Sequence, residues 1–528
     1  MKNQMISAVC LLTAGLAGAE ALSEKPNVIV VLADDISARE FPVYGSSVWT
    51  PSHPKPGNDS TSDPAYRATT PVLDRLAEQG CYIQNTWAAT ICSPSRAMLM
   101  TGRYAHLHKW WFNGDYGKYV NDKGEEQVWP LYESSPLQIG HIAQQAGYRT
   151  LWTGKTQMHG GDLTRFGFDS VVCTPGEDDN LKKGETPPTD FRLAPILVNG
   201  KKTFRNIDSG STNDFSWAAA SFYWQPSVRL INVPYGSGNH QWWPNTPESK
   251  EAYGLNTFGP DVELEFALDF IEQQHADEKP FFVYHAMHLG HNAFDFLNQG
   301  GKWTGTPVVK WTGSGYVREE PRITGDRGVY DTSSITPPSI NHQINYIDYQ
   351  MWLYEEKLKE LGIEDNTIII FCADNGTAAY GKAYPLRQRG CHVPMIIYAP
   401  GMTKHGRQDI LVNLADILPT LADIIGFQFP EDYEINGKSL WPYLTTDDGT
   451  HRKWIYSYQG DKQLIRGDKV LLDGFERWWN VETDPADFDS YPEITDWSTV
   501  SEQHLMERKM LEKILPDFDL HETEHDAP

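Results

Sequence analysis

The chain has 528 residues, of which 40% are hydrophobic and 22% charged, and it is long enough to bury a full core. Its formal net charge is −25. This acidity argues against a nucleic-acid-binding protein, which would present a basic face, and against broad adhesion to anionic membranes. An anionic substrate is still compatible with the composition, because the local field in a cleft can oppose the net charge.

The first element in chain order is a short apolar run after Lys2, which ends in small residues with an A-x-A pattern such as Ala17-Gly-Ala19. The run is shorter than the ~20 apolar residues that a membrane span needs. It therefore predicts a signal peptide over residues 1–21, and a periplasmic or secreted protein. Lipid attachment at Cys10 is the alternative, but Cys10 lies too early in the run. No other stretch predicts a membrane span.

Four apolar runs are each followed at once by residues that can bind or react. The runs and their followers are "NVIVVLADD" with Asp34 and Asp35, "YRTLWTGK" with Lys155, "KPFFVYHAMHLGH" with His285, His288 and His291, and "NTIIIFCADNG" with Asp374 and Asn375. Such runs are typical of strands buried on both faces of a parallel sheet. Ligands bind beyond the carboxyl ends of these strands, so the four clusters predict one site.

Helical patterns lie between the apolar runs, at residues 69–80, 136–147, 262–274 and 345–362. Alternation of strands and helices predicts an α/β fold, with a large mostly parallel mixed sheet sandwiched by helices. Segments 45–68, 174–260 and 292–335 are irregular and predict long functional loops.

The pattern changes near residue 450, where short strands precede a helical segment at residues 500–515. We therefore expect a catalytic domain over residues 22–448. A smaller C-terminal α+β domain with a short antiparallel sheet is expected over residues 449–528.

The two acidic clusters at strand ends, Asp34-Asp35 and Asp374-Asn375, offer only oxygen donors. Oxygen ligands suit a hard divalent cation such as calcium or magnesium better than zinc or copper. Either pair alone is more commonly a helix cap or a turn. Together, at the ends of two buried strands, they predict a metal site.

Cys92 stands before Pro94 in "ICSPSRAMLM", and proline suits the first turn of a helix. The cysteine is therefore predicted at a helix N-terminus, where the helix dipole favours an anion. The residues alone leave open a buried structural cysteine, a disulfide partner and a low-pKa thiolate nucleophile. No Cys-His-Asn signature supports the thiolate. The other four cysteines of the mature chain either pair or are simply buried.

The segment "CSPSRAMLMTGR" resembles the signature C-x-P-S-R-x-x-x-L/M-T-G of the type I sulfatases, members of the alkaline-phosphatase-like superfamily. The similarity covers nearly the whole chain. It extends to "NVIVVLADD", "TTPVLDRLAEQG", "IIIFCADNG", "VNLADILPTLADIIG" and "WWNVETDP". The resemblance implies a sulfuric ester hydrolase.

The resemblance also implies that a maturation enzyme oxidises Cys92 to formylglycine. In its hydrated form, one hydroxyl attacks sulfur with the aid of a metal, and the other then expels sulfate. By the same resemblance the metal is Ca2+, with Mg2+ as the alternative. Its implied ligands are Asp34, Asp35, residue 92, Asp374 and Asn375.

Further roles follow from the resemblance for residues around Cys92. Arg96 orients and stabilises the formylglycine, Lys155 contacts residue 92 and a sulfate oxygen, and Lys382 in "YGKAYPLRQRGCHVP" is the second sulfate-binding lysine. His291 protonates the leaving oxygen, and His288 supports substrate binding nearby. His285 is best explained as a buried histidine with satisfied hydrogen bonds.

The chain departs from the family pattern at three places. The usual G-K-x-H is here "GKTQMHG", so we assign His159 as the base for sulfate elimination, with Gln157 as the alternative. The usual proline of H-x-P-H is replaced by Gly290. The usual "EGG-x-R-V-P" is here "QRGCHVP", which we expect to alter the rim of the site.

A sulfated carbohydrate is the expected substrate, because the chain carries an export signal, long loops and the tryptophan pairs Trp110-Trp111 and Trp242-Trp243. Exposed tryptophans would stack on sugar rings, whereas core packing is the more common fate of such residues. Alternative functions are a phosphodiesterase or phosphonate monoester hydrolase of the same superfamily, and a carbohydrate-binding pseudoenzyme.

Overall fold

A computed structural model describes most of the chain. The described residues are 25–52, 54–158, 163–174, 193–198, 201–206, 212–213, 223, 228–243, 258–291, 306–319, 322–324, 329–331, 340–447, 449–519 and 521. The signal peptide predicted at residues 1–21 lies outside them and stays a prediction. Among the described helices, none combines the length and the apolar character needed to cross a membrane.

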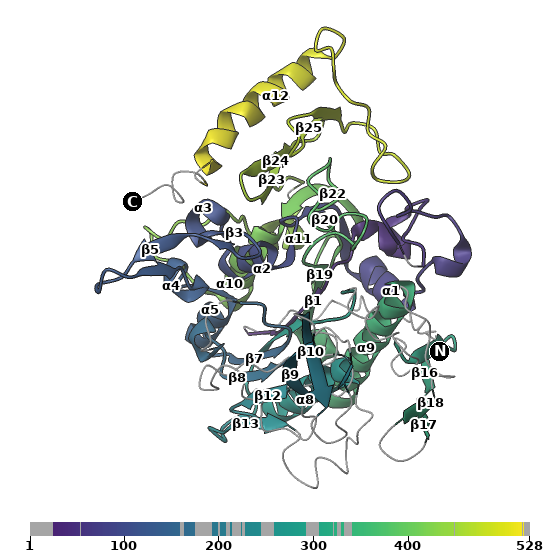
Figure 1. The fold of residues 1–528 in the computed structure, drawn as a ribbon, viewed down its shortest axis with the longest axis vertical. Helices are drawn as coiled ribbons and strands as arrows, with labels where there is room; N and C mark the ends of the chain where they lie inside the picture. Colours follow the sequence, from purple (N-terminus) through teal and green to yellow (C-terminus); the bar gives the residue numbers. More distant parts are fainter. Residues whose placement is uncertain are drawn as a thin grey trace, which may run out of the picture.

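An eleven-stranded mixed sheet forms the centre of the molecule (Figure 1), with neighbouring strands in the order β13-β12-β8-β7-β14-β1-β19-β21-β2-β20 and β22 beside β2. Its strands are β1 Asn27–Ala33, β2 Cys81–Trp87, β7 Arg149–Gly154, β8 Ser170–Cys173, β12 Val228–Ile231, β13 His240–Trp243, β14 Phe281–Ala286, β19 Thr367–Ala373, β20 His392–Val393, β21 Met395–Tyr398 and β22 Gly406–Asn413. The five strands from β8 to β19 are parallel, whereas antiparallel pairs join β12 and β21 to them. The predicted mostly parallel mixed sheet is confirmed.

The strand register places the four predicted clusters side by side. Every residue of β1 and β19 is buried, as expected for apolar strands covered on both faces. Leu32 of β1 lies opposite Ala286 of β14 and Cys372 of β19, and Ala286 lies opposite Gly154 of β7. The residues that follow these four strands therefore emerge together at one edge of the sheet.

Two groups of helices cover the sheet. The helices are α1 Pro71–Gln79, α2 Cys92–Thr101, α3 Ala105–His108, α4 Leu131–Ser134, α5 Ile139–Gln145, α8 Gly259–Ala276, α9 Ile340–Leu361, α10 Ile417–Ile425, α11 Trp441–Thr445 and α12 Glu502–Ile514. Helix α9 contacts both α1 and α8, and α2, α5 and α10 contact one another. In Figure 1, α1 and α9 lie on the opposite side of β1 from α2, α5 and α10. This confirms the predicted sandwich and its four helices.

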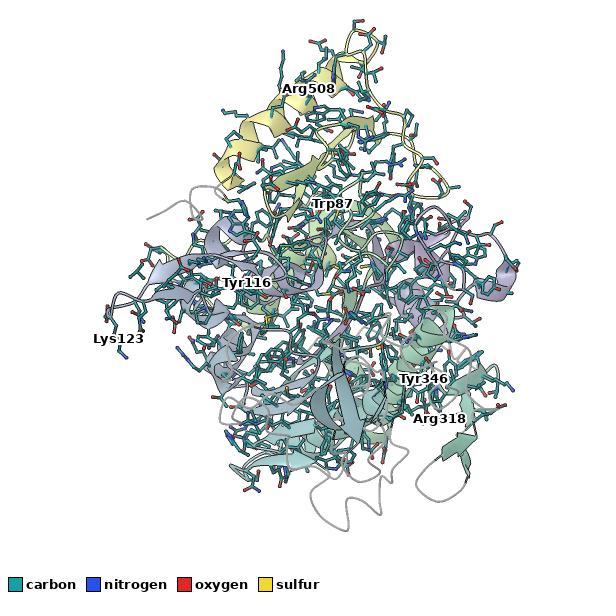
Figure 2. All side chains as sticks on the ribbon, viewed as in Figure 1. Trp87, Tyr116, Lys123, Arg318, Tyr346 and Arg508 are labelled. Atoms are coloured by element: carbon teal, nitrogen blue, oxygen red, sulfur yellow. The ribbon has the colours of Figure 1, made fainter. Side chains whose placement is uncertain are left out.

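A four-stranded antiparallel sheet and α12 follow residue 449, with strands β23 Ile455–Gln459, β24 Lys462–Arg466, β25 Val470–Leu472 and β26 Trp478–Asn480. A separate hydrophobic cluster joins this sheet to β2. It includes Trp87, which Figure 2 labels, together with Ile455, Leu464, Leu471 and Trp479. The smaller antiparallel sheet is confirmed, while the predicted domain boundary at residue 448 stays a prediction.

The segments predicted as loops at 174–260 and 292–335 contain strands, so those predictions are wrong in part. Beyond β12 and β13, the strands are β9 Leu193–Val198, β10 Lys201–Asn206, β11 Thr212–Asn213, β15 Val308–Trp311, β16 Tyr316–Glu319, β17 Arg322–Thr324 and β18 Val329–Asp331. Short hairpins β3 Trp110–Phe112 with β4 Asp115–Tyr116, and β5 Lys118–Val120 with β6 Glu126–Val128, follow α3. Strands this short leave little periodicity among the surrounding Gly and Pro residues.

The five cysteines of the described chain are buried, and Cys81, Cys92, Cys372 and Cys391 are free thiols. Of the two outcomes left open, burial without pairing is therefore observed for Cys81, Cys372 and Cys391.

Asp416 at the start of α10 anchors the segment between α10 and β23. Its carboxylate accepts hydrogen bonds from the backbone of Asn413 at 2.9 Å and Lys438 at 2.7 Å, and it pairs with Arg452 and with His451 at 3.1 Å. Burial would raise the pKa of Asp416, but Arg452 and His451 outweigh it and lower that pKa. The ion pair is buried, so removing one partner leaves an uncompensated charge.

We predict that Asp416→Asn lowers the free energy of unfolding by about 3 kcal/mol, measured as a lower melting temperature, because Arg452 loses its partner. Asp423→Asn, at an exposed position of α10, is the matched control and should change little. Because the pKa of Asp416 is lowered, its contribution is present at neutral pH and is lost as pH falls below the ordinary value of 3.8. Equal melting temperatures for the two variants at neutral pH would contradict this assignment.

Candidate active site

Three buried carboxylates form the floor of the site. Asp34 and Asp35 follow β1, and Asp374 follows β19; all are fully buried. The backbone N–H of Asp35 donates to Asp374 Oδ1 at 2.9 Å, and Asn375 Nδ2 donates to Asp35 Oδ1 at 2.8 Å. Ligand atoms of the three carboxylates and of Cys92 lie within 4.8 Å of one another. The structure thus brings together the residues predicted to hold a metal.

Cys92 begins α2, as predicted, and points its thiol at the carboxylates. Its Sγ lies 3.7 Å from Asp34 Oδ1 and 3.6 Å from Asp35 Oδ1. Burial, together with the charges of Asp374 and Asp35, raises the pKa of the Cys92 thiol well above its ordinary value, although Lys155 and Lys382 oppose this. The raised pKa argues against a thiolate nucleophile at Cys92.

Each carboxylate of the floor has a different cation as its nearest partner, and Arg96 also lies 3.6 Å from Asp34 Oδ1. Arg96 lies one turn after Cys92, fully buried, and its Nε and Nη2 donate to Asp374 Oδ2 at 3.0 and 2.8 Å. Lys155, which follows β7, pairs with Asp34, and Lys382 Nζ lies 2.6 Å from Asp35 Oδ2.

The two lysines are partly accessible, with 11% and 21% of the side chain exposed for Lys155 and Lys382, whereas Arg96 is not. The lysines can therefore meet a ligand that Arg96 cannot reach.

The pKa values of Asp34 and Asp374 are shifted in opposite directions, although both carboxylates pair with cations. Burial would raise the pKa of Asp34, but Lys155, His291, Arg96 and Lys382 together hold it well below its ordinary value. Burial and the neighbouring charge of Asp34 raise the pKa of Asp374 in spite of Arg96. The repulsion that remains around Asp374 favours an additional cation at this floor.

The three histidines of "HAMHLGH" have different surroundings. His291 Nε2 lies 3.1 Å from Lys382 Nζ and 3.7 Å from Asp35 Oδ2, so His291 borders the lysines. Burial, with the nearby lysines, lowers the pKa of His291 to about 4, although Asp35 and Asp34 act in the opposite direction. His285 is fully buried and its Nδ1 bonds Tyr354 Oη at 3.0 Å, but its Nε2 has no hydrogen-bond partner among the described residues, so the predicted burial is observed and the predicted full satisfaction is not.

His288 is 1% exposed and its Nε2 lies 2.6 Å from the carbonyl oxygen of Thr174. A fully buried glutamate that sequence reasoning missed, Glu263 of α8, lies 3.5 Å from His288 Nε2 and 3.7 Å from His285 Nε2, and also bonds Thr174. Its only sequence signal is a charge between Val262 and Leu264 of an apolar helix face. Substrate binding by His288 stays a prediction, because its contacts are with this inner network.

The segment "GKTQMHG" is described only as far as Met158, so His159 lies outside the described residues and its role as a base stays a prediction. Gln157 has a positive φ of 44° and is half-buried. Its Oε1 has no hydrogen-bond partner among the described residues. Gln157 therefore remains the alternative.

Two glycines let the functional loops approach the sheet closely. Gly154, before Lys155, has a φ of 96°, and a Cβ there would lie 2.2 Å from the carbonyl oxygen of Ala286. Gly290, before His291, has a φ of 103°, and a Cβ there would lie 1.9 Å from the carbonyl oxygen of Asp34. Gly290, which replaces the family's proline, thus lies where the neighbouring backbone leaves no room for a side chain.

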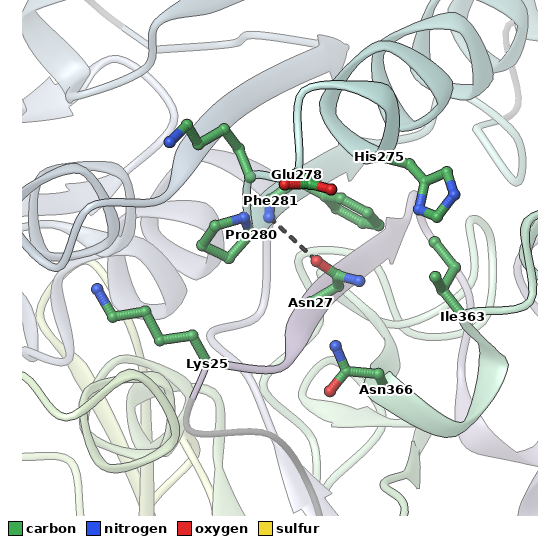
Figure 3. A pocket seen from close by; sticks show the side chains of 9 residues that line it. Lys25, Asn27, His275, Glu278, Pro280, Phe281, Ile363 and Asn366 are labelled. Carbon is green, nitrogen blue, oxygen red and sulfur yellow. Dashed lines mark hydrogen bonds between the residues drawn. The ribbon is translucent and has the colours of Figure 1, made fainter.

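A pocket of about 240 Å³ lies at the opposite end of the sheet (Figure 3), beside Lys25, Asn27 and His275. The amide N–H of Phe281, at the start of β14, donates to Asn27 Oδ1 at 3.2 Å there. This is the amino end of the parallel strands, whereas ligands of such sheets bind at the carboxyl end. The cluster around Cys92 is therefore the candidate active site.

A family model described as Sulfatase matches residues 26–427. The chain belongs to the sulfatase family. It is accordingly a sulfuric ester hydrolase. Its sequence is 25% identical over 464 residues to N-acetylgalactosamine-6-sulfatase of Homo sapiens, covering 84% of this chain and 70% of that protein. It is 22% identical over 533 residues to N-acetylgalactosamine-6-O-sulfatase of Bacteroides thetaiotaomicron, covering 91% of each.

Solved structures share the fold of this sulfatase. The crystal structure of Ps i-CgsB in complex with k-i-k-neocarrahexaose superimposes with a TM-score of 0.58 at 17% identity, over 93% of this chain and 92% of that one. The structure of BT4656 in complex with D-glucosamine-2-N,6-O-disulfate gives a TM-score of 0.56 at 17% identity, over 95% and 100%. The predicted α/β sulfatase fold is confirmed.

We predict that Gly290→Ala abolishes most activity, by about 100-fold or more, because the new methyl group would displace the His291 loop from β1. Gly313→Ala is the matched control. Gly313 has a φ of 102° but nothing within 4 Å of its Cβ position, so both variants carry similar backbone strain and only one carries the clash. Sulfate release by purified, folded variants measures the difference. Comparable losses in the two variants would refute the steric explanation.

Proposed function

We propose that this chain is an exported sulfatase that removes a sulfate ester from a carbohydrate, with formylglycine at position 92 and a divalent metal, Ca2+ rather than Mg2+. The arrangement around Cys92 carries the proposal: a nucleophile position at a helix N-terminus, three carboxylates below it, and two partly accessible lysines beside it. Export rests on the signal-peptide pattern of residues 1–21. Formylglycine implies a maturation enzyme as a partner.

The donor set suits a hard divalent cation. Asp34, Asp35, Asp374 and Asn375 would hold it with residue 92, and all their ligand atoms are oxygens apart from the unmodified thiol. Asn375 Oδ1 is buried and has no hydrogen-bond partner among the described residues, as expected of an atom reserved for a cation. Bound there, the cation would act as a Lewis acid toward the oxygen of residue 92 and the sulfate.

The charge balance supports an anionic substrate. Arg96, Lys155 and Lys382 offset the three carboxylates of the floor. A divalent cation would therefore leave the site net positive inside a chain of net charge −25. Such a local field attracts a sulfate ester that the outer surface would repel.

The side chains of this site divide the work as follows. Lys155 and Lys382 bind sulfate oxygens and offset the charge that builds up as the ester bond breaks. Arg96 holds Asp374, and through it the floor, in place. His291, beside Lys382, donates a proton to the leaving oxygen; an anionic ester bound next to it would raise its low pKa.

A carbohydrate is proposed as the substrate class because the relatives named above are N-acetylgalactosamine sulfatases, and the structural neighbours are bound to D-glucosamine-2-N,6-O-disulfate and to k-i-k-neocarrahexaose. These identities belong to those proteins. For this chain we propose the class, not the sugar or the position of its sulfate.

Mass spectrometry and sulfate release on the same sample test the function. Protein co-expressed with a formylglycine-generating enzyme should show a loss of about 18 Da at residue 92. It should release sulfate from 4-nitrophenyl sulfate, or from members of a panel of sulfated mono- and oligosaccharides. Cys92→Ala, whose position cannot be matured, should be inactive by at least about 1,000-fold.

Bis(4-nitrophenyl) phosphate is the counter-substrate in that experiment. If the protein hydrolyses only the phosphate diester, the sulfatase proposal is wrong and the phosphodiesterase alternative is supported. Full sulfate release by protein that carries only an unmodified thiol would show that the proposed formylglycine mechanism is wrong. Protein expressed without the formylglycine-generating enzyme should show neither the mass loss at residue 92 nor sulfate release. Co-expression with that enzyme should give both.

Metal binding has a readout that does not depend on activity. We predict that chelation lowers the melting temperature of the wild type and that millimolar Ca2+ restores it, since a ligand at 100 times its Kd stabilises by about 2.7 kcal/mol. Asn375→Ala should reduce the calcium-dependent shift, whereas Asn58→Ala, at an exposed position, should retain it. A shift that is unchanged in Asn375→Ala would place the cation elsewhere.

A further inference from the structure

Three of the four paired tryptophans that the sequence offered for sugar stacking are not available for it. Trp110, Trp111 and Trp243 are at most 3% exposed, and the side chain of Trp242 lies outside the described residues. For the three described tryptophans, core packing is the observed outcome. Within the described part of the chain, a stacking surface must therefore come from other aromatic residues.

Two aromatic side chains stand out on the described surface. Five large hydrophobic residues are well exposed there, and only two of them are aromatic, Tyr384 at 39% and Phe475 at 42%. These two rings contact one another edge to face, with centroids 6.0 Å apart and an interplanar angle of 68°. Paired, exposed aromatic rings are typical of binding sites rather than of inert surface.

The pair lies next to the proposed sulfate site. Tyr384 is two residues after Lys382, and a chain of two residues spans at most roughly 7 Å. The intervening residue is fixed from both sides: the backbone N–H of Ala383 donates to Thr90 at 2.7 Å, and Gln459 Nε2 donates to the Ala383 carbonyl at 2.8 Å. The backbone that carries Tyr384 is therefore held at the edge of the site.

Phe475 reaches this edge from the C-terminal sheet, in the turn between β25 and β26. The backbone N–H of Gly474 donates to the carbonyl oxygen of Pro385 at 2.9 Å. A Cβ at Gly474 would lie 2.6 Å from Pro385 Cβ, so the two segments approach as closely as a glycine allows. The aromatic pair is thus a built junction between the Lys382 loop and the C-terminal sheet.

Cations flank the aromatic pair. Lys462 Nζ and the Arg477 guanidinium each lie 5.2 Å from the centre of the Phe475 ring, and the Arg389 guanidinium lies 6.0 Å from that of Tyr384. Lys462 is exposed, and 39% of the Arg477 side chain is exposed. Aromatic surface with accessible cations suits a ligand that has apolar C–H faces and anionic substituents.

We propose that Tyr384 and Phe475 form a binding subsite for the sugar unit next to the one whose sulfate is removed. In this subsite, Lys462 and Arg477 bind a sulfate or carboxylate group on that neighbouring unit. The proposal rests on the proposed function, since it assigns the second unit of the same carbohydrate substrate. The apolar face of the sugar ring packs on the aromatic pair, and recognition of the anion gives specificity for a multiply charged chain.

The double variant Tyr384→Ala/Phe475→Ala tests the stacking surface. The two substrates are the sulfated oligosaccharide from which the wild type releases sulfate fastest, and the sulfated monosaccharide that corresponds to the unit whose sulfate is removed. The variant's kcat/KM should fall about tenfold more on the oligosaccharide than on the monosaccharide, mainly through KM. Tyr384→Phe should behave like the wild type, and Met506→Ala, at an exposed apolar position of α12, controls for surface substitution.

The outcomes separate the two proposals. Equal changes on both substrates, with melting temperatures like that of the wild type, would overturn the subsite and leave the sulfatase proposal intact. A matured wild type that releases no sulfate from any carbohydrate of the panel would overturn the proposed function, and the subsite with it.

The double variant Lys462→Gln/Arg477→Gln tests the anionic contact. The substrates are two oligosaccharides that differ only in a sulfate on the neighbouring unit, and the wild type should prefer the doubly sulfated one. In the variant, the ratio of kcat/KM for the two oligosaccharides should be about tenfold smaller. Arg508→Gln, on α12 (Figure 2), is the matched control. An unchanged preference in the double variant would overturn the assigned role of the two cations.

Discussion

The pairing of three buried carboxylates with three cations is the constraint on which the rest of the site depends. The parallel register of β7, β14, β1 and β19 places the three carboxylates and Lys155 together, with the carboxylates buried away from water. Burying an unpaired charge costs several kcal/mol, so the arrangement is stable only if each group has a partner. Arg96, Lys155 and Lys382 supply the partners, and each comes from a different segment of the chain.

This pairing explains why positions in the surrounding loops are so restricted. Lys155 and His291 reach the carboxylates only because glycines precede them where the loops touch neighbouring backbone. The Lys382 loop is held by hydrogen bonds to Thr90 and Gln459 and by its contact with the turn before β26. The C-terminal sheet thus takes part in shaping the site edge, although the carboxylates and their cations lie outside it.

The sequence predicted the parts of the site that depend on strand ends, because a buried apolar run followed by Asp-Asp or Asp-Asn is visible without tertiary information. Cys92, Pro94 and Arg96 were likewise readable from one contiguous segment. Glu263 could not be predicted from the sequence, because a single charged residue on a helix is normally expected to face solvent. Only the packing of α8 shows that it is buried. The strands of the irregular segments were too short to leave a periodic signal, and the Tyr384–Phe475 pair joins residues 91 positions apart that only the tertiary fold brings into contact.

In the proposed mechanism the carboxylates hold a cation while Lys155 and Lys382 hold the sulfate above it. A crystal structure of the matured protein, grown with Ca2+ and soaked with sulfate, would show both ions in place. We expect a calcium ion ligated by Asp34, Asp35, Asp374 and Asn375, and a sulfate ion between the two lysines beside residue 92. A sulfate bound elsewhere, or lysines still paired with Asp34 and Asp35 and no cation in density, would contradict it.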